Sequence, residues 1–489
     1  GPVRPRPGPV AGAGRRPPVQ CLAYSDDGIE FTKPIFDVVN GTNIVQTDPI
    51  DGSTVWLDLD EPDPAARYKM AAVFARNKYG AYTILHSADG VHWTVFLDKT
   101  GPIADRSSVF LNPLRRPRKW IYSIKSGPPP DTHGPFGRSR SYWESADLGV
   151  GADWKSKYDH AWTNADVFDP PWGCGGPEEG NFTQLYNLDA VAFESVIVGL
   201  FSIFTGKHCA AGENQSATDS GHWVYNRTGE WDSVFTGFSR DGFHWFRPVI
   251  DGKHRVFLPM DDSIVQGSPP DWRWNKANVQ SVGGGFMVHS DPTPQAEGQL
   301  RVGSGMSSSN SVLRFYVGAR TGVDQIGGNA TAGFAELRRD GFASISATND
   351  EAAVHRLVTH PLRFSTAVKG PTPVLFLNAE HAEGLSVSVL DAHTHDPLPG
   401  LMESDWKGVT SVSGSAASSG DRLKGSWSDA RAVASASDRT VRLSFRFRTP
   451  TTQLFSFWIA RDSCGASDGW VAAGGPTFNS SRDLYGACA

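Results

Sequence analysis

Several features that would place the chain quickly in a class are missing. It has no run of 18 apolar residues, so the sequence predicts no membrane span. The net charge is −6 with both signs spread through the chain, and this argues against a nucleic-acid partner. Helical stripes are scarce, and the one candidate, residues 350–358, is about two turns long. Phosphate-binding loops and metal-ligand clusters are also absent, so we expect neither a cofactor nor a metal ion.

Cysteine is rare as well, with five residues in the chain, and none has the spacing of zinc ligands. Cys464 and Cys488 bracket the C-terminal tail, and Cys174 and Cys209 bracket a glycine-rich segment. We expect each pair to form a disulfide, which would indicate an oxidising compartment. Cys21 is then left over, either free or paired with an extracellular protein partner.

Glycosylation sequons point to the same compartment. Six N-x-S/T sequons occur, where chance would give about two or three. They are Asn40, Asn181, Asn214, Asn226, Asn329 and Asn479. We therefore expect a secreted or cell-surface glycoprotein. Because no signal peptide opens the sequence, we expect it to be a processed or trimmed form.

Glycine (52), proline (33) and tryptophan (16) are abundant, a mixture typical of short aromatic strands joined by many turns. Residues 1–20 hold six prolines and four arginines, which predicts an extended arm. That arm could serve as a strap, a stalk or a linker, and it is a second candidate for contacting a protein partner. The window Val191 to Phe204 is the most apolar and reads as a pair of buried strands.

A recurring hairpin follows the arm. Its shared core is Ser/Arg-x-Asp-Gly-x-x-aromatic, as in HSADGVHWTVF and SRDGFHWFRP, with weaker copies in ESADLGVGADW and ELRRDGFASIS. Asp-Gly between alternating apolar runs predicts a tight turn, because glycine accepts a positive φ. The turn aspartates are Asp27, Asp89, Asp147, Asp241 and Asp340. Spacings near 60 residues, lengthened by insertions, predict a five-bladed β-propeller over residues 21–365, with these aspartates as turn residues at its outer rim.

The pattern changes beyond about residue 365. Runs such as Val441 to Phe447 and Leu454 to Ile459 alternate with period two and lack the Asp-Gly hairpin. This predicts a separate antiparallel β-sandwich with a C-terminal tail over residues 366–489. The fold class expected is all-β, a propeller followed by a sandwich.

These features resemble glycoside hydrolase family 32 and, more closely, the family-32-like propeller proteins. The resemblance is carried by TVWLDLDEPDPAARYKM, SRDGFHWFRP, RRDGFASISA and TVRLSFRFRTPTTQLFSFWI, and it runs from about Ala23 to Ile459. It implies the same propeller and sandwich, with a glycan or polysaccharide bound at the propeller axis.

In family 32, three acids ring the central cavity: a nucleophile in blade one, an aspartate that steadies the sugar in blade two, and a general acid in blade three. The family's motifs for these acids are not intact here. By position, Asp48 and Asp58 compete for the first role, Asp105 lies at the second, and Glu178 or Glu179 at the third. Glycoside hydrolysis needs such a pair of carboxyl groups, one of them with a raised pKa.

Each candidate also has a structural interpretation. Asp105 could cap a strand, and Glu178–Glu179 could form a solvated acidic loop beside a glycan on Asn181. Trp172 and Trp272 lie in loops rich in glycine and proline, where they could stack on sugar rings or pack beneath the loops.

Two functions therefore remain open. One is a glycoside hydrolase-like, carbohydrate-active protein. The other is a non-catalytic extracellular glycoprotein whose propeller serves as a binding or assembly platform.

Overall fold

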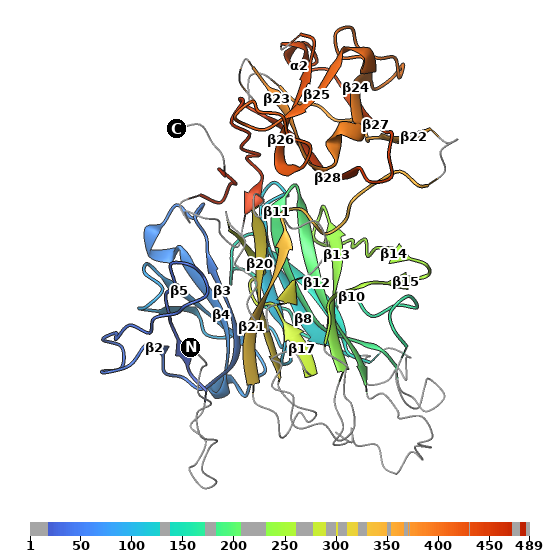
Figure 1. Ribbon diagram of the computed structural model, residues 1–489. Helices are drawn as coiled ribbons and strands as arrows, with labels where there is room; N and C mark the ends of the chain where they lie inside the picture. Colours follow the sequence, from blue (N-terminus) through green and yellow to red (C-terminus); the bar gives the residue numbers. More distant parts are fainter. Residues whose placement is uncertain are drawn as a thin grey trace, which may run out of the picture.

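A computed structural model shows an all-β chain, as predicted (Figure 1). It describes residues 18–127, 137–171, 182–206, 231–260, 277–289, 300–301, 311–320, 330–349, 354–365, 370, 372–429, 431–471 and 480–485. Within these ranges the helices are single turns: η1 (Pro64–Ala66), η2 (Ala75–Asn77), η4 (Ala382–Gly384), η5 (Glu403–Asp405) and α2 (Ala432–Ser435). None of the described helices has the length and apolar character needed to cross a bilayer.

Four large sheets, built mainly from antiparallel pairs, form the body of the molecule. The first sheet contains β3 (Ile50–Leu57), β4 (Tyr68–Phe74), β5 (Tyr82–Ser87) and β6 (Thr94–Leu97). The second contains β7 (Ser108–Asn112), β8 (Lys119–Ser126), β9 (Ser139–Ser145) and β10 (Ala161–Thr163). The third contains β11 (Gln184–Glu194), β12 (Val196–Gly206), β13 (Trp231–Ser239), β16 (Val256–Leu258) and the distant β29 (Trp470–Val471). The fourth contains β17 (Ala277–Ser281), β18 (Phe286–His289), β19 (Leu300–Arg301), β20 (Val312–Arg320) and β21 (Ala330–Arg338).

One apolar core joins these sheets. Trp120 of the second sheet, Val191 of the third and Phe315 of the fourth all belong to it, and each is at most 1% exposed. The predicted strand pair at Val191 to Phe204 is confirmed, because β11 and β12 pair along nearly their whole length. Long central strands that are apolar on both faces are stable only when they are covered on both sides, which explains the continuous hydrophobic run.

The N-terminal segment bridges the first and fourth sheets. Its two short strands, β1 (Gln20–Cys21) and β2 (Ile44–Gln46), pair with each other. Arg314 Nη1 in the fourth sheet donates to the carbonyl of Asp27 at 2.7 Å, and Tyr316 donates from its hydroxyl to the carbonyl of Gly28 at 2.7 Å. Of the predicted arm, residues 1–17 lie outside the described residues.

The turn prediction is confirmed at Asp27, Asp89 and Asp241. At each, one carboxylate oxygen accepts the backbone N–H groups of the second and third residues that follow, at 2.7–2.9 Å. The glycines that follow these aspartates have φ of +71°, +77° and +80°, which explains why glycine is required there.

Asp340 also lies in a turn, as expected, but its contacts differ from those of the other copies. It adopts φ +56°, and its Oδ2 accepts hydrogen bonds from the side chains of Asn378, at 3.3 Å, and Ser456. The fifth copy lacks the aromatic three residues after the glycine, and its carboxylate connects the body to the C-terminal sheets.

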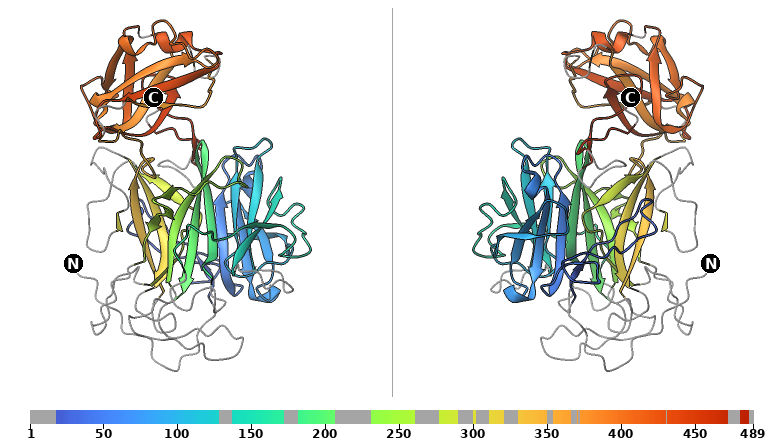
Figure 2. Two further views of the ribbon diagram at one scale, coloured as in Figure 1. Left: turned by 90° about the vertical axis from the view of Figure 1, so that its right-hand side faces the viewer. Right: turned by 90° about the vertical axis from the view of Figure 1, so that its left-hand side faces the viewer.

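Two further sheets hold a second apolar core and stand at one end of the body (Figure 2). One contains β22 (His355–Val358), β27 (Val441–Phe447) and β24 (Leu385–Asp391). The other contains β25 (Trp406–Thr410), β26 (Gly420–Trp427), β23 (Val374–Glu380) and β28 (Gln453–Ala460). A short hairpin of β14 (Val249–Ile250) and β15 (Lys253–His254) lies apart from these sheets.

The helix expected at residues 350–358 is wrong over its described part, because residues 355–358 form β22. There His355 and Leu357 lie opposite Phe447 and Phe445, so the period-two pairing with an apolar strand overrides a weak local helical pattern.

The chain crosses twice between the body and the C-terminal sheets. After β21 it leaves the body, and near its end β29 returns to pair with β11 through Phe193 and Val471. Arg339 of the body forms ion pairs with Glu194 and with Asp483 of the tail.

Two of the five cysteines, Cys21 and Cys464, lie among the described residues. Cys21 is a free, exposed thiol, and Cys464 is disulfide-bonded. Cys488, Cys174 and Cys209 lie outside the described residues, so both predicted pairings stay predictions.

Candidate functional site

Asp105 lies in the turn that leads into β7, at the end of the body away from the C-terminal sheets. The end of β8 and the start of β9 are at the same level, because Ser126 pairs with Ser139. The start of β11 is near too, since Arg140 contacts the carbonyl of Tyr186. We call Asp105, Lys125, Arg138, Arg140 and Tyr186 together the Asp105 site.

Local hydrogen bonds fix the turn that carries Asp105. Ser107 donates from Oγ to the carbonyl of Ala104 at 2.8 Å and accepts the backbone N–H of Lys125 at 2.9 Å. Arg106 adopts φ +58°, a conformation that non-glycine residues rarely take and that often marks functional sites. The turn therefore holds the Asp105 side chain beside β8.

Lys125 provides the counter-charge to Asp105, with Nζ at 2.7 Å from Oδ1. The aspartate is 53% exposed and the lysine 10% exposed. Burial acts to raise the pKa of Asp105, but the hydrogen bond and charge of Lys125, helped by Arg106 and Arg138, outweigh it and leave the pKa below its usual value. Burial lowers the pKa of Lys125 to about 8, although Asp105 opposes this shift.

An aromatic ring completes the accessible part of the site. Lys125 Nζ lies 4.8 Å from the ring centroid of Tyr186, and the Arg138 guanidinium lies 5.0 Å from the same centroid. Arg138 also lies 5.0 Å from the ring of Phe204. Cations held over an aromatic face are attracted to it electrostatically, so these contacts orient both side chains.

Arg140 lies fully buried beneath this layer. Its guanidinium donates to the carbonyl of Arg106 at 2.7 Å, to the carbonyl of Tyr186 and to Oδ1 of Asn187 at 3.3 Å. Burial lowers its pKa to about 10, while the charge of Asp189 opposes the shift, so the group stays charged at neutral pH. Arg140 thus ties together the second and third sheets directly below Asp105.

Asp189 extends the network to the fourth sheet. Its Oδ2 accepts hydrogen bonds from the side-chain amide of Asn187 at 2.9 Å and from the backbone N–H of Val282 at 3.1 Å.

Chemically, the site offers an ionised, half-exposed carboxylate at Asp105 above a rigid charged layer. Such a carboxylate suits a nucleophile, a general base or an acceptor for sugar hydroxyls, and it does not suit a general acid.

The other described acid candidates do not join this site. Asp58 follows β3, at the end of the body near the C-terminal tail, where neighbouring Asp60 accepts from Ser481. Its buried carboxylate forms a bidentate pair with Arg118, at 2.7 and 2.8 Å. Asp48 precedes β3, as Asp105 precedes β7, and its Oδ2 lies 3.3 Å from Nε of Arg76.

The remaining predicted residues are mostly outside the described residues. This holds for Glu178, Glu179, Trp172 and Trp272, and for the sequons at Asn181, Asn214, Asn226, Asn329 and Asn479. Asn40 is described and exposed, as a glycosylated residue must be.

Sequence reasoning missed the cations of the site. Lys125, Arg138 and Arg140 lie in segments that read simply as strands and connections. A signal was present in KWIYSIKS, where Lys125 follows the largely apolar run from Trp120 to Ile124, because buried lysines are rare unless they are paired.

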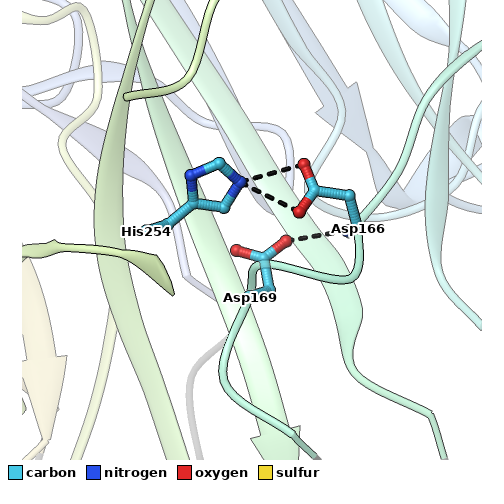
Figure 3. Close-up of side chains that lie close together, drawn as sticks. All are labelled: Asp166, Asp169 and His254. Carbon is cyan, nitrogen blue, oxygen red and sulfur yellow. Dashed lines mark hydrogen bonds and ion pairs between the residues drawn. The ribbon is translucent and has the colours of Figure 1, made fainter. Parts of the chain in front are cut away.

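Three side chains beside the third sheet are arranged like the ligands of a metal ion. Ligand atoms of Asp166, Asp169 and His254 lie within 4.8 Å of one another (Figure 3). Arg247 already supplies the positive charge, since it pairs with both oxygens of Asp169 and lies 3.4 Å from Asp166. A guanidinium in this position makes the group a structural ion-pair cluster.

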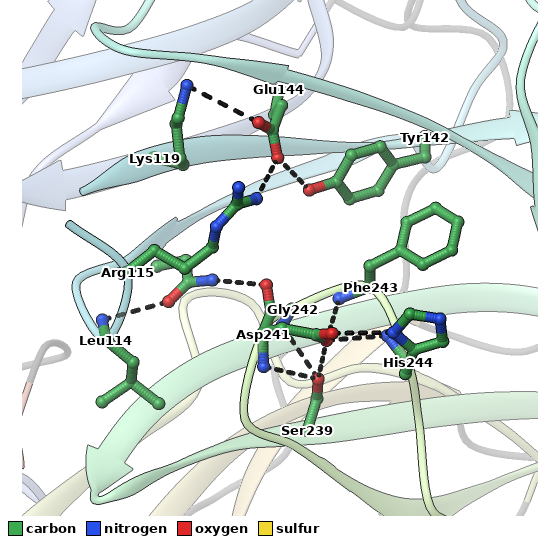
Figure 4. A network of polar contacts seen from close by, with 11 residues as sticks. Leu114, Arg115, Lys119, Tyr142, Glu144, Ser239, Asp241, Gly242, Phe243 and His244 are labelled. Atoms are coloured by element: carbon green, nitrogen blue, oxygen red, sulfur yellow. Dashed lines mark hydrogen bonds and ion pairs between the residues drawn. The ribbon is translucent and has the colours of Figure 1, made fainter. Parts of the chain in front are cut away.

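A second polar network joins the second and third sheets (Figure 4). Glu144 accepts from Arg115 at 2.6 Å and from Tyr142 at 2.5 Å, and Asn112 donates to the carbonyl of Asp241 at 2.7 Å. The bond from Asn112 docks the Asp241 turn on the second sheet, and the bonds of Glu144 stay within that sheet, so both have structural roles.

Two cavities lie elsewhere. One of about 500 Å³ lies between the first and fourth sheets, lined by Trp56, Tyr68 and Tyr316. The other, of about 750 Å³, lies between the body and the C-terminal sheets, lined by Arg240 and Trp470 among others.

The fold and site together define an all-β protein that carries an ionised carboxylate, near cations and an aromatic ring, at one end of its large sheets.

No family model and no curated protein sequence matches the chain. Among solved structures, a putative glycosidase from Bacteroides thetaiotaomicron matches with a TM-score of 0.32 and 12% identity, over 66% of this chain and 79% of that one.

Two further enzymes also match. A GH32 β-fructofuranosidase from Bombyx mori has a TM-score of 0.21 and 11% identity, over 81% of this chain and 89% of that one. A sucrose-6-phosphate hydrolase from Lactobacillus gasseri has a TM-score of 0.25 and 9% identity, over 82% and 91%. The superpositions are loose, and the activities belong to those proteins.

Proposed function

We propose that the chain is a secreted carbohydrate-active protein, glycoside hydrolase-like, that binds or acts on a glycan at the axis of a five-bladed propeller. The observation that carries the proposal is the Asp105 site: an ionised, accessible carboxylate beside a tyrosine ring, held by Lys125. Carboxylates that accept hydroxyl hydrogen bonds and aromatic faces that stack on rings are the two elements of most sugar sites.

The proposed architecture is a ring of four large sheets closed by the N-terminal segment. The contacts of Asp27 and Gly28 with the fourth sheet, and of Asp37 with His92 of the first, support this closure. The two C-terminal sheets around one core would be the sandwich. Boundaries at residues 21–365 and 366–489, with an arm over 1–20, remain predictions. β22 precedes residue 366 but belongs to the C-terminal sheets, and β29 follows residue 366 but belongs to a sheet of the body.

In this proposal Asp105 acts in its ionised form. A hydrolase would also need an acid with a raised pKa, and Glu178 or Glu179, which precede β11 as Asp105 precedes β7, are our candidates. Asp48 precedes β3 in the same way and is the candidate for a third acid. A separation of about 5 to 5.5 Å between the catalytic carboxyl groups would make the enzyme retaining, and about 6.5 to 9.5 Å inverting.

The test compares Asp105→Asn and Glu179→Gln with the unmutated protein on a panel of plant and algal polysaccharides. Loss of hydrolysis by about 100-fold or more in both variants is expected for groups that act on the reacting atoms. Asp251→Asn is the matched control, because Asp251 is 83% exposed and forms its ion pair with Arg255, outside the Asp105 site. Hydrolysis that is unchanged in both variants would discard this site.

The alternative, a non-catalytic platform, is favoured by one observation: Cys21 is a free and exposed thiol. A free surface thiol in a secreted protein suggests pairing with another chain. Inactivity over the whole panel, together with a Cys21-dependent disulfide-linked species on non-reducing gels, would support the platform. The proposed secretion is tested by the mass lost on enzymatic deglycosylation, with Asn40→Gln reporting on the described sequon.

A further inference from the structure

Three arginines gather on one side of the C-terminal sheets. β27 lies between β22 and β24, and Arg356 of β22 stands directly opposite Arg446 of β27 (Figure 1). Arg448 follows two residues after Arg446, so it falls on the same side of the sheet. The side chains of Arg356, Arg446 and Arg448 are 47%, 44% and 60% exposed. We call these three residues the arginine cluster.

The arginine cluster shares a single carboxylate, that of Glu403 at the start of η5. Oε1 of Glu403 lies 3.2 Å from Nη1 of Arg446 and 3.5 Å from Nη2 of Arg448. Its Oε2 lies 4.0 Å from Nη2 of Arg356. Ser386 also donates to Oε1, at 2.8 Å. Hydrogen bonds between a guanidinium and a carboxylate are normally about 2.7–2.9 Å long, so one carboxylate does not satisfy three cations.

This arrangement costs the sheet stability. Like charges directly opposite each other on neighbouring strands are destabilising, and Arg356 and Arg446 form such a pair. Glu383 precedes the residue whose carbonyl binds the backbone of Arg448, but it pairs with His381 instead, at 3.6 Å. A surface that keeps three exposed cations around one acid is better explained by a bound anion than by the stability of the sheet.

We propose that the arginine cluster is a second glycan site, which binds the sulfate ester groups of a sulfated polysaccharide. The choice of a glycan rests on the proposed function, and the choice of an anion rests on the arginines. Like a phosphate group, a sulfate ester has three terminal oxygens around one centre, so it accepts from guanidiniums that converge from two strands. The net charge of −6 and the small size of the cluster disfavour nucleic acid, which needs an extended basic surface.

The experiment compares one polysaccharide backbone with different groups attached. Dextran sulfate, carboxymethyl dextran and unmodified dextran are titrated into the full chain by calorimetry. Dextran sulfate is expected to bind about 10-fold or more tightly than either of the others, because its third oxygen adds a hydrogen bond to a charged donor. Its affinity should fall as salt is raised, since the arginines are exposed and their charges are screened.

Variants assign the binding to residues. Arg356→Gln, Arg446→Gln and Arg448→Gln should each weaken the binding of dextran sulfate by about 10-fold. Arg439→Gln is the matched control, because Arg439 is 48% exposed on the same sheets and has a carboxylate of its own, that of Asp391 at 3.1 Å. Three separate variants keep the test valid if one of them fails to fold.

Glu403→Gln distinguishes an anion site from a purely structural cluster. Glutamine keeps a side-chain oxygen for the hydrogen bond from Ser386 but removes the negative charge that competes with the ligand. The affinity for dextran sulfate should therefore rise by about 5-fold. Arginines that served only to hold Glu403 would give no gain, and that result would overturn the proposal.

The remaining outcomes separate this inference from the proposed function. Binding of dextran sulfate that is unchanged in all three arginine variants, or that is lost in Asp105→Asn, would place the ligand elsewhere and overturn the proposal. Polyglutamate or phosphatidylserine vesicles that bind as tightly as dextran sulfate would also overturn it, because the partner would then be an acidic protein or a membrane. Hydrolysis unchanged in Asp105→Asn, with sulfate binding at the arginine cluster intact, would discard the Asp105 site and keep this one.

Discussion

Replacing Gly28 with alanine tests whether the N-terminal segment closes the body. Gly28 has φ +71°, and a Cβ there would lie 2.8 Å from Nη1 of Arg314 and still closer to the hydroxyl of Tyr316. The added carbon would push the turn away from the fourth sheet and break both hydrogen bonds to it. Gly41 has φ +76° and open space around its Cβ position, so Gly41→Ala carries the backbone cost alone.

The expected magnitudes follow from these contacts. The left-handed conformation costs alanine about 1–2 kcal/mol in either variant. Gly28→Ala also loses a hydrogen bond from a charged donor, worth about 1.5–3 kcal/mol, and a neutral one, worth about 0.5–1.5 kcal/mol. Gly28→Ala should therefore destabilise the N-terminal segment by about 2–4 kcal/mol more than Gly41→Ala.

Hydrogen exchange is the assay, because a chain of this size does not unfold in one step. The reporters are the amides of Tyr24 and Thr32, which bond to each other's carbonyls at 3.0 and 2.8 Å. Their protection should fall about 30-fold or more further in Gly28→Ala than in Gly41→Ala. Equal protection in the two variants would refute the idea that this turn is anchored on the fourth sheet.

Two other contacts give predictions of their own. His92 bonds Asp89 at 2.7 Å and Asp37 at 2.9 Å, and these bonds, led by that from Asp89, raise its pKa. The stabilisation is therefore complete below the unfolded pKa of about 6.5 and is lost as pH rises through the folded value. Hydrogen exchange near Asp37 should accelerate over that range in the unmutated protein and show no such pH step in His92→Gln; a step that persists would contradict this. Arg118→Gln should lower the local stability of β3 by about 3 kcal/mol. This is the low end of the range for breaking a buried ion pair, because Arg118 is 26% exposed. Adding Asp58→Asn should restore part of the lost stability, because no unpaired charge is then left buried. A double variant no more stable than Arg118→Gln would contradict the pairing.

The features that local chemistry dictates could be predicted from the sequence. The Asp-Gly turns follow from the φ that glycine alone accepts cheaply, and the β11–β12 pair follows from an unbroken apolar run. The contacts of Asp340 with the C-terminal sheets escaped prediction because its partners, Asn378 and Ser456, are distant in the sequence.

The candidate site was less predictable for the same reason. Asp105 could be selected from its position before an apolar strand. Of the cations that lower its pKa, Arg106 is its neighbour in the sequence, but Lys125 in β8 and Arg138 just before β9 become its neighbours only in the folded chain. Likewise, Asp58 looks like a free acid in the sequence, and its partner Arg118 is 60 residues away. Long-range ion pairs leave no periodic pattern to read.

The double crossing between the body and the C-terminal sheets has a mechanical consequence. A domain attached by a single linker can swing and twist freely about it. Here the chain leaves after β21 and comes back as β29 on the edge of β11, and Asp340 and Arg339 clamp the same region. Two attachment points leave at most a rocking motion about the line that joins them. The 750 Å³ cavity lies between the two parts, so the same restraint limits how far its walls can move apart.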